Sequence, residues 1–254
     1  MAEPPPTVGL FVTCLVDLLR PSVGFAAARL LERAGCRVIV PRGQTCCGQP
    51  AYNSGARDIA AGIAGGLVEA FDGLDYVVAP SGSCAAMLKL HVPGLFDDGT
   101  ALRARAERVA ERTWELMSFL VDVRGMGDVE AAFDGRAAYH DGCSGLRELG
   151  VRDQPRRLLS SVDGLEIREM DDTEVCCGFR GAFCVKYPDI SEAMADRKAE
   201  AIEAAGASVV LSGELGCLLN IAGKLSRRGS DIEARHAAEI LAGMTDAPPI
   251  GAPK

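Results

Sequence analysis

The sequence is poor in the residues that several classes of protein require. Its 254 residues include three histidines and one tryptophan, which leaves little room for histidine-based catalysis. The formal charge of −8 argues against nucleic acid as the main partner, because phosphate binding depends on basic patches. No apolar run approaches the roughly 18 residues of a membrane-spanning helix, so we expect no membrane span. What the chain does contain is ten cysteines.

Motifs for nucleotide cofactors and for nucleophilic catalysis are also missing. No G-x-G-x-x-G follows an expected strand, so a nicotinamide or flavin site has no support in the sequence. No Ser-His-Asp or Cys-His arrangement has a spacing that indicates nucleophilic catalysis. The first residues lack a basic region followed by a long apolar stretch, so we expect no secretory signal and a cytoplasmic protein. Its cysteines should then be free thiols, because a reducing cytosol disfavours disulfides.

Eight of the ten cysteines form two sets with nearly the same spacing, each built around a Cys-Cys-Gly sequence. Matched positions lie 129, 130 and 133 residues apart, which indicates a duplicated domain. Four thiolates per half are the donor set of a structural zinc ion or of an iron–sulfur cluster. The first set is Cys14, Cys46, Cys47 and Cys84, and the second is Cys143, Cys176, Cys177 and Cys217.

Strands alternate with helices in both halves, which predicts an α/β fold of two duplicated Rossmann-like βαβ domains with parallel sheets. Each cysteine of a set comes directly after an expected strand, in a strand-to-helix loop. The carboxyl ends of parallel strands share one edge of a sheet, so we expect each set to gather there. The expected strands are residues 8–13, 37–40, 75–79, 137–140, 165–169 and 208–212, and the expected helices are residues 21–34, 53–71, 155–161, 189–205 and 231–241.

The repeat divides the chain into two domains and a connector. We place the first domain at residues 1–93 and the second at residues 135–254, each carrying one cysteine set. Residues 94–134 have no counterpart among the cysteine loops, so we interpret them as a connector with helices at about residues 102–123. Each half is long enough to bury a core of its own.

The spacing of the cysteines favours iron–sulfur clusters over zinc. Zinc sites usually draw ligands from C-x2-C knuckles, and neither half contains one. Two adjacent cysteines can more easily hold two different irons of one cluster than share a single ion. Helices that begin after the Cys-Cys-Gly turns would direct backbone N–H groups toward the cluster sulfurs. Buried cysteines without any metal are a third possibility, but they would not explain the matched spacing.

The twin pattern resembles the cysteine-rich CCG domain family, which includes a subunit of the heterodisulfide reductases. The segments HDGCSGLRELG, CCGFRGAF and SGELGCLLNI of the second half resemble the lactate-utilization branch of that family. The resemblance covers nearly the whole chain and implies two iron–sulfur clusters. It also implies a subunit that transfers electrons while L-lactate is oxidised to pyruvate. The implied partners are a ferredoxin-like iron–sulfur subunit and a third lactate-utilization subunit.

Two departures from the family pattern bear on the chemistry. The fullest form of the motif ends each repeat in C-x-x-C, but Ser81 and Glu214 stand at the first of those two positions. Four thiols per half suit a [4Fe–4S] cluster, and they argue against cleavage of a disulfide. Arg180 stands where close relatives tend to have glycine, and this difference has no interpretation. We therefore expect a subunit of an oxidoreductase complex. A heterodisulfide-reductase-like catalytic subunit and a zinc-stabilised scaffold without redox function are the alternatives.

Several other residues near the expected loops have both a structural and a functional interpretation. For Cys36 and Cys184 we favour packing, and for His91 and His236 positions on helices without a chemical role. His140 precedes the Cys143 loop, and its imidazole could serve the second cluster or the core. Gly48 and Gly178 would allow a tight turn or simply a helix entry. Three basic residues could attract a carboxylate substrate, although solvated surface charge is the simpler interpretation: Arg147, Arg180 and Lys186.

Overall fold

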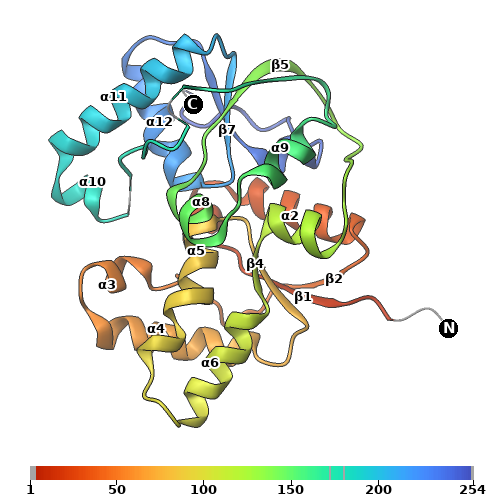
Figure 1. Ribbon diagram of the computed structural model, residues 1–254, viewed down its shortest axis with the longest axis vertical. Coiled ribbons are helices and arrows are strands. Elements are labelled where there is room, and N and C mark those ends of the chain that lie inside the picture. Colours follow the sequence, from red (N-terminus) through yellow and green to blue (C-terminus); the bar gives the residue numbers. More distant parts are fainter. Residues whose placement is uncertain (1–3, 172, 180, 253–254) are drawn as a thin grey trace.

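A computed structural model describes residues 4–171, 173–179 and 181–252 of the protein. These residues form two four-stranded parallel sheets with the same strand order, β2-β1-β3-β4 and β6-β5-β7-β8 (Figure 1). The repeated topology confirms the predicted fold of two duplicated Rossmann-like units. The strands are β1 Thr7–Leu10, β2 Arg37–Ile39, β3 Tyr76–Ala79, β4 Thr113–Glu115, β5 Ala132–Tyr139, β6 Asp163–Arg168, β7 Val209–Ser212 and β8 Glu233–His236.

Helices join the strands and cover the sheets (Figure 1). Proline occupies the first position of α2 and of α11, where its missing N–H costs no hydrogen bond. The helix expected at residues 53–71 begins only at Arg57, because Gly55 adopts a positive φ of 79° and separates α4 from the short helix α3, which ends at Asn53. The helices are α1 Cys14–Leu19, α2 Pro21–Arg33, α3 Gln49–Asn53, α4 Arg57–Phe71, α5 Gly82–Ala86, η1 Met87–His91, η2 Pro93–Leu95, α6 Ala101–Glu111, α7 Leu116–Ser118, η3 Phe119–Val123, α8 Cys143–Leu149, α9 Asp153–Leu159, α10 Phe183–Lys186, α11 Pro188–Ala204, α12 Leu215–Arg227 and α13 Ala237–Leu241.

The fourth strand of each sheet was not expected from the sequence. Residues 231–241 contain strand β8, which pairs with β7, and only then the short helix α13. His236 therefore lies at the end of a strand and caps α13, which corrects its predicted place on a helix. Strand β4 lies inside residues 94–134 and pairs with β3, so part of the proposed connector joins the first sheet. The boundaries at residues 93 and 134 remain a proposal.

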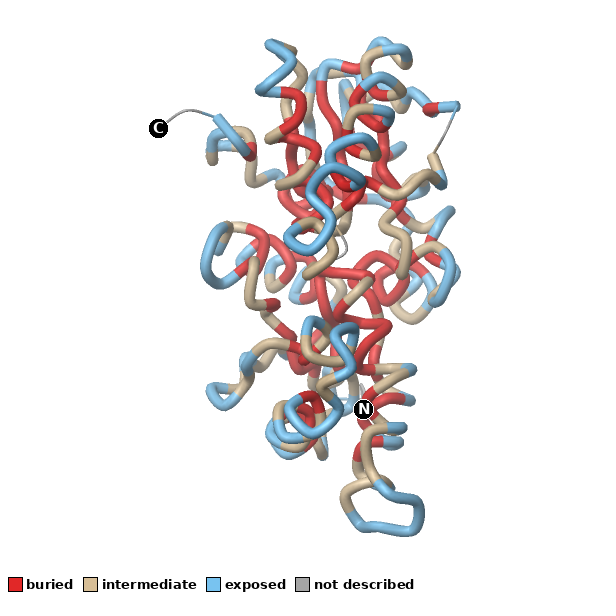
Figure 2. Tube along the Cα trace, turned by 90° about the vertical axis from the view of Figure 1, so that its left-hand side faces the viewer, coloured by how far each residue is buried: buried red, intermediate tan, exposed pale blue. Residues whose placement is uncertain are grey.

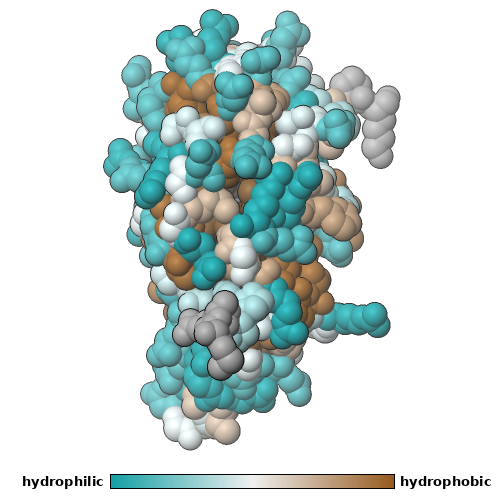
Figure 3. All heavy atoms as spheres, turned by 90° about the vertical axis from the view of Figure 1, so that its right-hand side faces the viewer, coloured by the Kyte–Doolittle hydropathy of each residue, from teal (hydrophilic) through white to brown (hydrophobic). Residues whose placement is uncertain are grey.

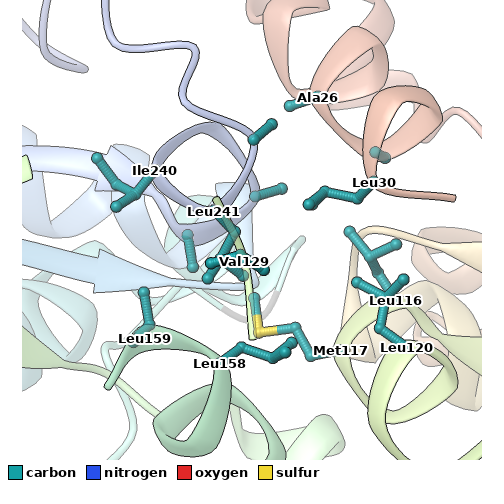
Figure 4. Packing of buried hydrophobic residues seen from close by; sticks show 14 of the residues in the cluster. Ala26, Leu30, Leu116, Met117, Leu120, Val129, Leu158, Leu159, Ile240 and Leu241 are labelled. Carbon is teal, nitrogen blue, oxygen red and sulfur yellow. The ribbon is translucent and has the colours of Figure 1, made fainter. Parts of the chain in front are cut away.

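The two halves share a hydrophobic core, so they form one body (Figure 4). Helix α2 of the first half packs on α13 of the second, and buried chain continues from one half into the other (Figure 2). An ion pair with an N–O distance of 2.9 Å joins Arg20 to the buried carboxylate of Glu239 across the same contact. The shared core contains Ala26, Leu30, Leu116, Met117, Leu120, Val129, Leu158, Leu159, Ile240 and Leu241.

The molecular surface is mainly hydrophilic on the face shown in Figure 3, with apolar side chains in separate patches. Within the described ranges, we find no helix with the length and apolar character needed to cross a membrane. Clusters of buried side chains instead lie against the sheets inside each half and between the halves.

Candidate metal centre

All eight cysteines of the two sets line one cavity of about 210 Å³. The loops that carry them follow the carboxyl ends of the strands, as the βαβ pattern predicts. Cys14 and Cys143 begin α1 and α8, while Cys84 and Cys217 lie in the first turns of α5 and α12. The sequence does not predict that the two sheets direct these edges toward each other. The structure brings the two sets to a common space between the halves.

The thiols of each set are connected by hydrogen bonds in the same order. In the first set, the thiol of Cys46 is hydrogen-bonded to the thiols of Cys14 and Cys47, and the thiol of Cys47 is hydrogen-bonded to that of Cys84. The second set repeats this order: Cys176 is hydrogen-bonded to Cys143 and Cys177, and Cys177 is hydrogen-bonded to Cys217. The duplication therefore extends to the contacts between sulfur atoms. Four sulfurs that lie this close together suit one polynuclear centre per set.

The crowding of the thiols controls their ionisation. Hydrogen bonds from Cys14, Cys47 and backbone N–H groups lower the pKa of Cys46, so this sulfur is held as a thiolate. The hydrogen bond to Cys46 and burial raise the pKa of Cys14 and of Cys47 above that of an ordinary thiol. Further thiolates in the set would repel the first in a partly buried site. Bound cations remove this penalty, so the donor set fits a group rich in metal ions.

The Cys-Cys-Gly turns bring backbone N–H groups close to the sulfurs. Gly48 and Gly178 both adopt a positive φ, 84° and 87°, which supports the tight-turn interpretation. The N–H of Gly178 donates to Sγ of Cys176 at 3.4 Å. A Cβ atom at Gly178 would lie 2.6 Å from the carbonyl oxygen of Ser191, so the backbone itself approaches closely there. Such donors stabilise thiolates and the sulfides of a cluster.

The two positions that depart from the family motif contact each other across the cavity. Ser81 Oγ donates to both carboxylate oxygens of Glu214 at 3.0 Å, and the N–H of Ser83 donates to Oε2 at 2.9 Å. Ser81 also accepts a hydrogen bond from the N–H of Cys84, which caps α5. Glu214 of the second half thus supports the helix start that holds Cys84 of the first. Burial raises the pKa of Glu214.

A carboxylate substrate would find no basic side chain among the described residues that line the cavity. Arg147 donates to the carbonyl oxygen of Glu174 at 3.0 Å, and Lys186 Nζ lies 3.4 Å from Ser54 Oγ. Neither residue lines the cavity, which favours the surface-charge interpretation for both. Arg180 lies outside the described residues.

The remaining cysteines and His91 do not line the cavity. Cys36 is buried in the shared core, as predicted. Cys184 is half-buried on α10, where its Sγ donates to the carbonyl oxygen of Gly181 at 3.1 Å. His91 Nε2 lies 2.9 Å from a carboxylate oxygen of Glu148, and its ring stacks on Tyr52.

His140 differs from these residues because it is fully buried beside the second set. One of its ring nitrogens and the sulfurs of Cys177 and Cys217 all lie within 4.8 Å of one another. Neither ring nitrogen has a hydrogen-bond partner in the described structure. Burial lowers the pKa of His140 to about 3, so the imidazole is neutral at physiological pH.

Glu115 is a buried carboxyl group near the cavity that no sequence motif indicates. Its Oε2 accepts hydrogen bonds from the N–H groups of Met117 and Ser118 at 2.9 and 3.0 Å. Burial raises its pKa to about 7, despite these two donors. The isolated glutamate in a three-residue strand gives no sequence signal, because its burial depends on the pairing of β4 with β3.

The raised pKa of Glu115 predicts a pH-dependent contribution to stability. As the pH rises from about 4.5 to about 7, the unfolded chain releases this proton before the folded chain does, so stability falls. Above pH 7 the buried charge costs about 3 kcal/mol. Glu115→Gln should remove this cost, so the variant should match the unmodified chain at pH 4 and be more stable at pH 8. Urea unfolding under reducing conditions measures the difference. Glu107→Gln, at an exposed site, is the control, and an equal gain in both variants would contradict the assignment.

The first set is also reached from a groove on the outer side of the molecule. This second cavity, of about 380 Å³, is bounded by Cys14, Cys46, Leu18, Val40 and Arg42, among others. Leu18 and Val40 are exposed apolar side chains at its rim. The first set of thiols therefore contacts both the shared cavity and this outer groove.

Comparison with known proteins places these features in a family context. A family model described as a cysteine-rich domain, CCG, matches residues 8–89 and again residues 137–222. Lactate utilization protein A of Geobacillus kaustophilus (strain HTA426) is 50% identical over 234 residues, covering 92% of this chain and 98% of that protein. The protein of the same name from Bacillus subtilis (strain 168) is 46% identical with the same coverage.

A solved structure shares the fold. The crystal structure of a hypothetical protein from Helicobacter pylori superposes with a TM-score of 0.62 at 13% sequence identity. The match covers 96% of this chain and 50% of that chain, so the present protein spans about half its length. At this identity the likeness concerns the fold alone.

Proposed function

The chain belongs to the cysteine-rich CCG domain family, together with the lactate utilization A proteins, and we propose that it is an electron-transfer subunit in the oxidation of L-lactate to pyruvate. In this proposal it carries two iron–sulfur clusters of the [4Fe–4S] type. The observation that carries the proposal is the convergence of two matched sets of four thiols on one cavity. We place the protein in the cytoplasm, where its thiols stay reduced.

The donor set supports iron–sulfur clusters over zinc. The first cluster would be held by Cys14, Cys46, Cys47 and Cys84, and the second by Cys143, Cys176, Cys177 and Cys217. In both sets the two adjacent cysteines are hydrogen-bonded to each other and each also to a different third thiol, so the four sulfurs form a chain of contacts. This arrangement suits several irons better than one tetrahedral zinc ion. When bound, such clusters supply one-electron transfer.

The residues around the sulfurs favour transfer over cleavage of a disulfide. Ser81 and Glu214 replace the fifth thiol of each set, and their side chains are engaged with each other. Each set is then left with four sulfur donors, enough for one ligand per iron of a [4Fe–4S] cluster. The backbone N–H groups of the Cys-Cys-Gly turns stabilise the thiolates, and Cys47, Cys84, Cys177 and Cys217 are buried. A catalytic role of the heterodisulfide-reductase type is the weaker alternative.

Assembly with partner proteins tests the proposed function. We propose a ferredoxin-like iron–sulfur subunit and a third lactate-utilization subunit as partners. Co-purification with both, followed by an anaerobic lactate oxidation assay with an artificial electron acceptor, should show activity that requires this chain. Glycolate and other 2-hydroxy acids serve as competing substrates. If the other two subunits oxidise lactate at the full rate without this chain, the proposed role in electron transfer is wrong.

A further inference from the structure

The two cysteine sets have different surroundings although their sulfurs are arranged alike. Aligning Cys14 with Cys143 places Phe11 of the first half opposite His140 of the second. Both side chains are fully buried. Phe11 packs edge-on against Phe71 with ring centroids 5.8 Å apart, an ordinary apolar contact. The second set therefore has a polar imidazole where the first has a phenyl ring.

His140 is positioned toward the sulfurs of the second set. Its backbone N–H donates to the carbonyl oxygen of Leu211 at 2.8 Å, which fixes the end of β5 against β7. One ring nitrogen lies within 4.8 Å of the sulfurs of Cys177 and Cys217, and both ring nitrogens lack partners in the described structure. A buried N–H without an acceptor is costly. A cluster-bound thiolate at either cysteine would supply that acceptor.

Charged groups add to the difference between the sets. Lys198 is fully buried on α11, and its charge acts on both Cys217 and His140. The charge of Arg147 lowers the pKa of Cys143. At Cys217 the charge of Lys198 lowers the pKa, whereas the carboxylate of Glu214 raises it. In the first set, the main groups that shift the pKa values of Cys14, Cys46 and Cys47 are other cysteines and backbone N–H groups.

We propose that His140 donates a ring N–H to a thiolate of the second set, Cys177 or Cys217, and thereby raises the reduction potential of the second cluster above that of the first. The inference rests on the proposed function, because it requires that both sets bind clusters. Hydrogen bonds to cluster sulfurs stabilise the reduced, more negative state. This asymmetry favours passage of an electron from the first set to the second, the first being oxidised as the second is reduced. His140 acts as a positioning residue that tunes the cluster.

Redox titration of the anaerobically reconstituted protein, followed by electron paramagnetic resonance, tests the inference. His140→Phe gives the second half the residue of the first and removes the N–H donor. It should shift the reduction equilibrium of one cluster at least tenfold toward the oxidised form, equivalent to about 59 mV for one electron. The other cluster should keep its potential. His140→Gln, which retains an N–H donor, should lower the potential of that cluster by less than His140→Phe does.

Two further variants identify the cluster and control for the substitution itself. In a Cys177→Ser background only the first cluster should remain, and His140→Phe should then change nothing. His91→Phe makes the same replacement away from the cavity and should leave both potentials unchanged. The His140→Phe variant could lose the second cluster altogether. In that case, a His140→Gln variant that also lacks the second cluster would overturn the inference, whereas a His140→Gln variant that keeps it would support the inference. Two intact clusters with unchanged potentials in His140→Phe would also overturn it. Unmodified protein without clusters would contradict the proposed function itself.

Discussion

Replacing Cys47 or Cys177 by serine is expected to remove about half of the bound iron, because each residue belongs to a different four-thiol set. Both side chains are buried, and each is hydrogen-bonded to two other thiols of its own set. Serine has nearly the same shape but binds iron far less well than a thiolate does. The cluster of the altered set should therefore be lost while the other set remains occupied.

Measurement of iron and acid-labile sulfide per chain after anaerobic purification detects the loss of a cluster directly. Cys36→Ser is the matched control, since Cys36 is also a buried thiol but lies in the shared core. It should keep the full iron content, although the added polarity will cost some stability. Full iron content in Cys47→Ser and in Cys177→Ser would show that the ligand assignment is wrong. Loss of all iron from either variant would show that the two sets do not bind independently.

Replacing Gly82 by alanine is expected to destabilise the contact between the two halves. A Cβ atom at Gly82 would lie 2.7 Å from Cα and 3.0 Å from the backbone nitrogen of Gly145. Backbone atoms cannot rotate away as a flexible side chain can, so α5 and α8 must move apart. We expect a loss of about 1–3 kcal/mol in the free energy of unfolding, the usual cost of overpacking. The same shift should disturb the hydrogen bonds between Ser81 and Glu214.

Gly66→Ala provides the matched control for Gly82→Ala. Gly66 is exposed on α4, and a Cβ atom there would meet nothing within 4 Å. Alanine favours a helix over glycine by up to about 1 kcal/mol, so this variant should be slightly more stable. Urea unfolding of both variants under reducing conditions compares the two sites. A Gly82→Ala variant as stable as the unmodified chain would argue against the close approach of α5 and α8.

The cysteine loops could be predicted from the sequence because their signal is local and repeated. Strands β1, β3 and β7 are short apolar runs and β5 ends in one, and a cysteine of a set follows each strand after a brief turn. Strand β4 and strand β8 have no such signal. Thr113–Glu115 is three residues long, and Glu233–His236 precedes an alanine-rich helix whose composition dominates the segment. Both become strands because a neighbouring strand offers backbone partners.

The common cavity could not be predicted, because it depends on contacts between distant residues. The ion pair of Arg20 with Glu239 and the hydrogen bonds of Ser81 with Glu214 join residues that are more than a hundred positions apart. No periodic pattern in the sequence indicates such pairs. For the same reason the surroundings of His140 and Glu115 became apparent only in the structure. The sequence indicates which residues are donors, while the packing of the halves determines what lies beside them.

The central claim is that each four-thiol set holds one iron–sulfur cluster, and metal analysis tests it most directly. The protein should be purified anaerobically, and its iron, sulfide and zinc should be measured together with its visible spectrum. We predict about eight iron and eight sulfide per chain, with broad absorbance near 400 nm that dithionite bleaches. A colourless protein with about two zinc ions per chain and no sulfide would contradict the account.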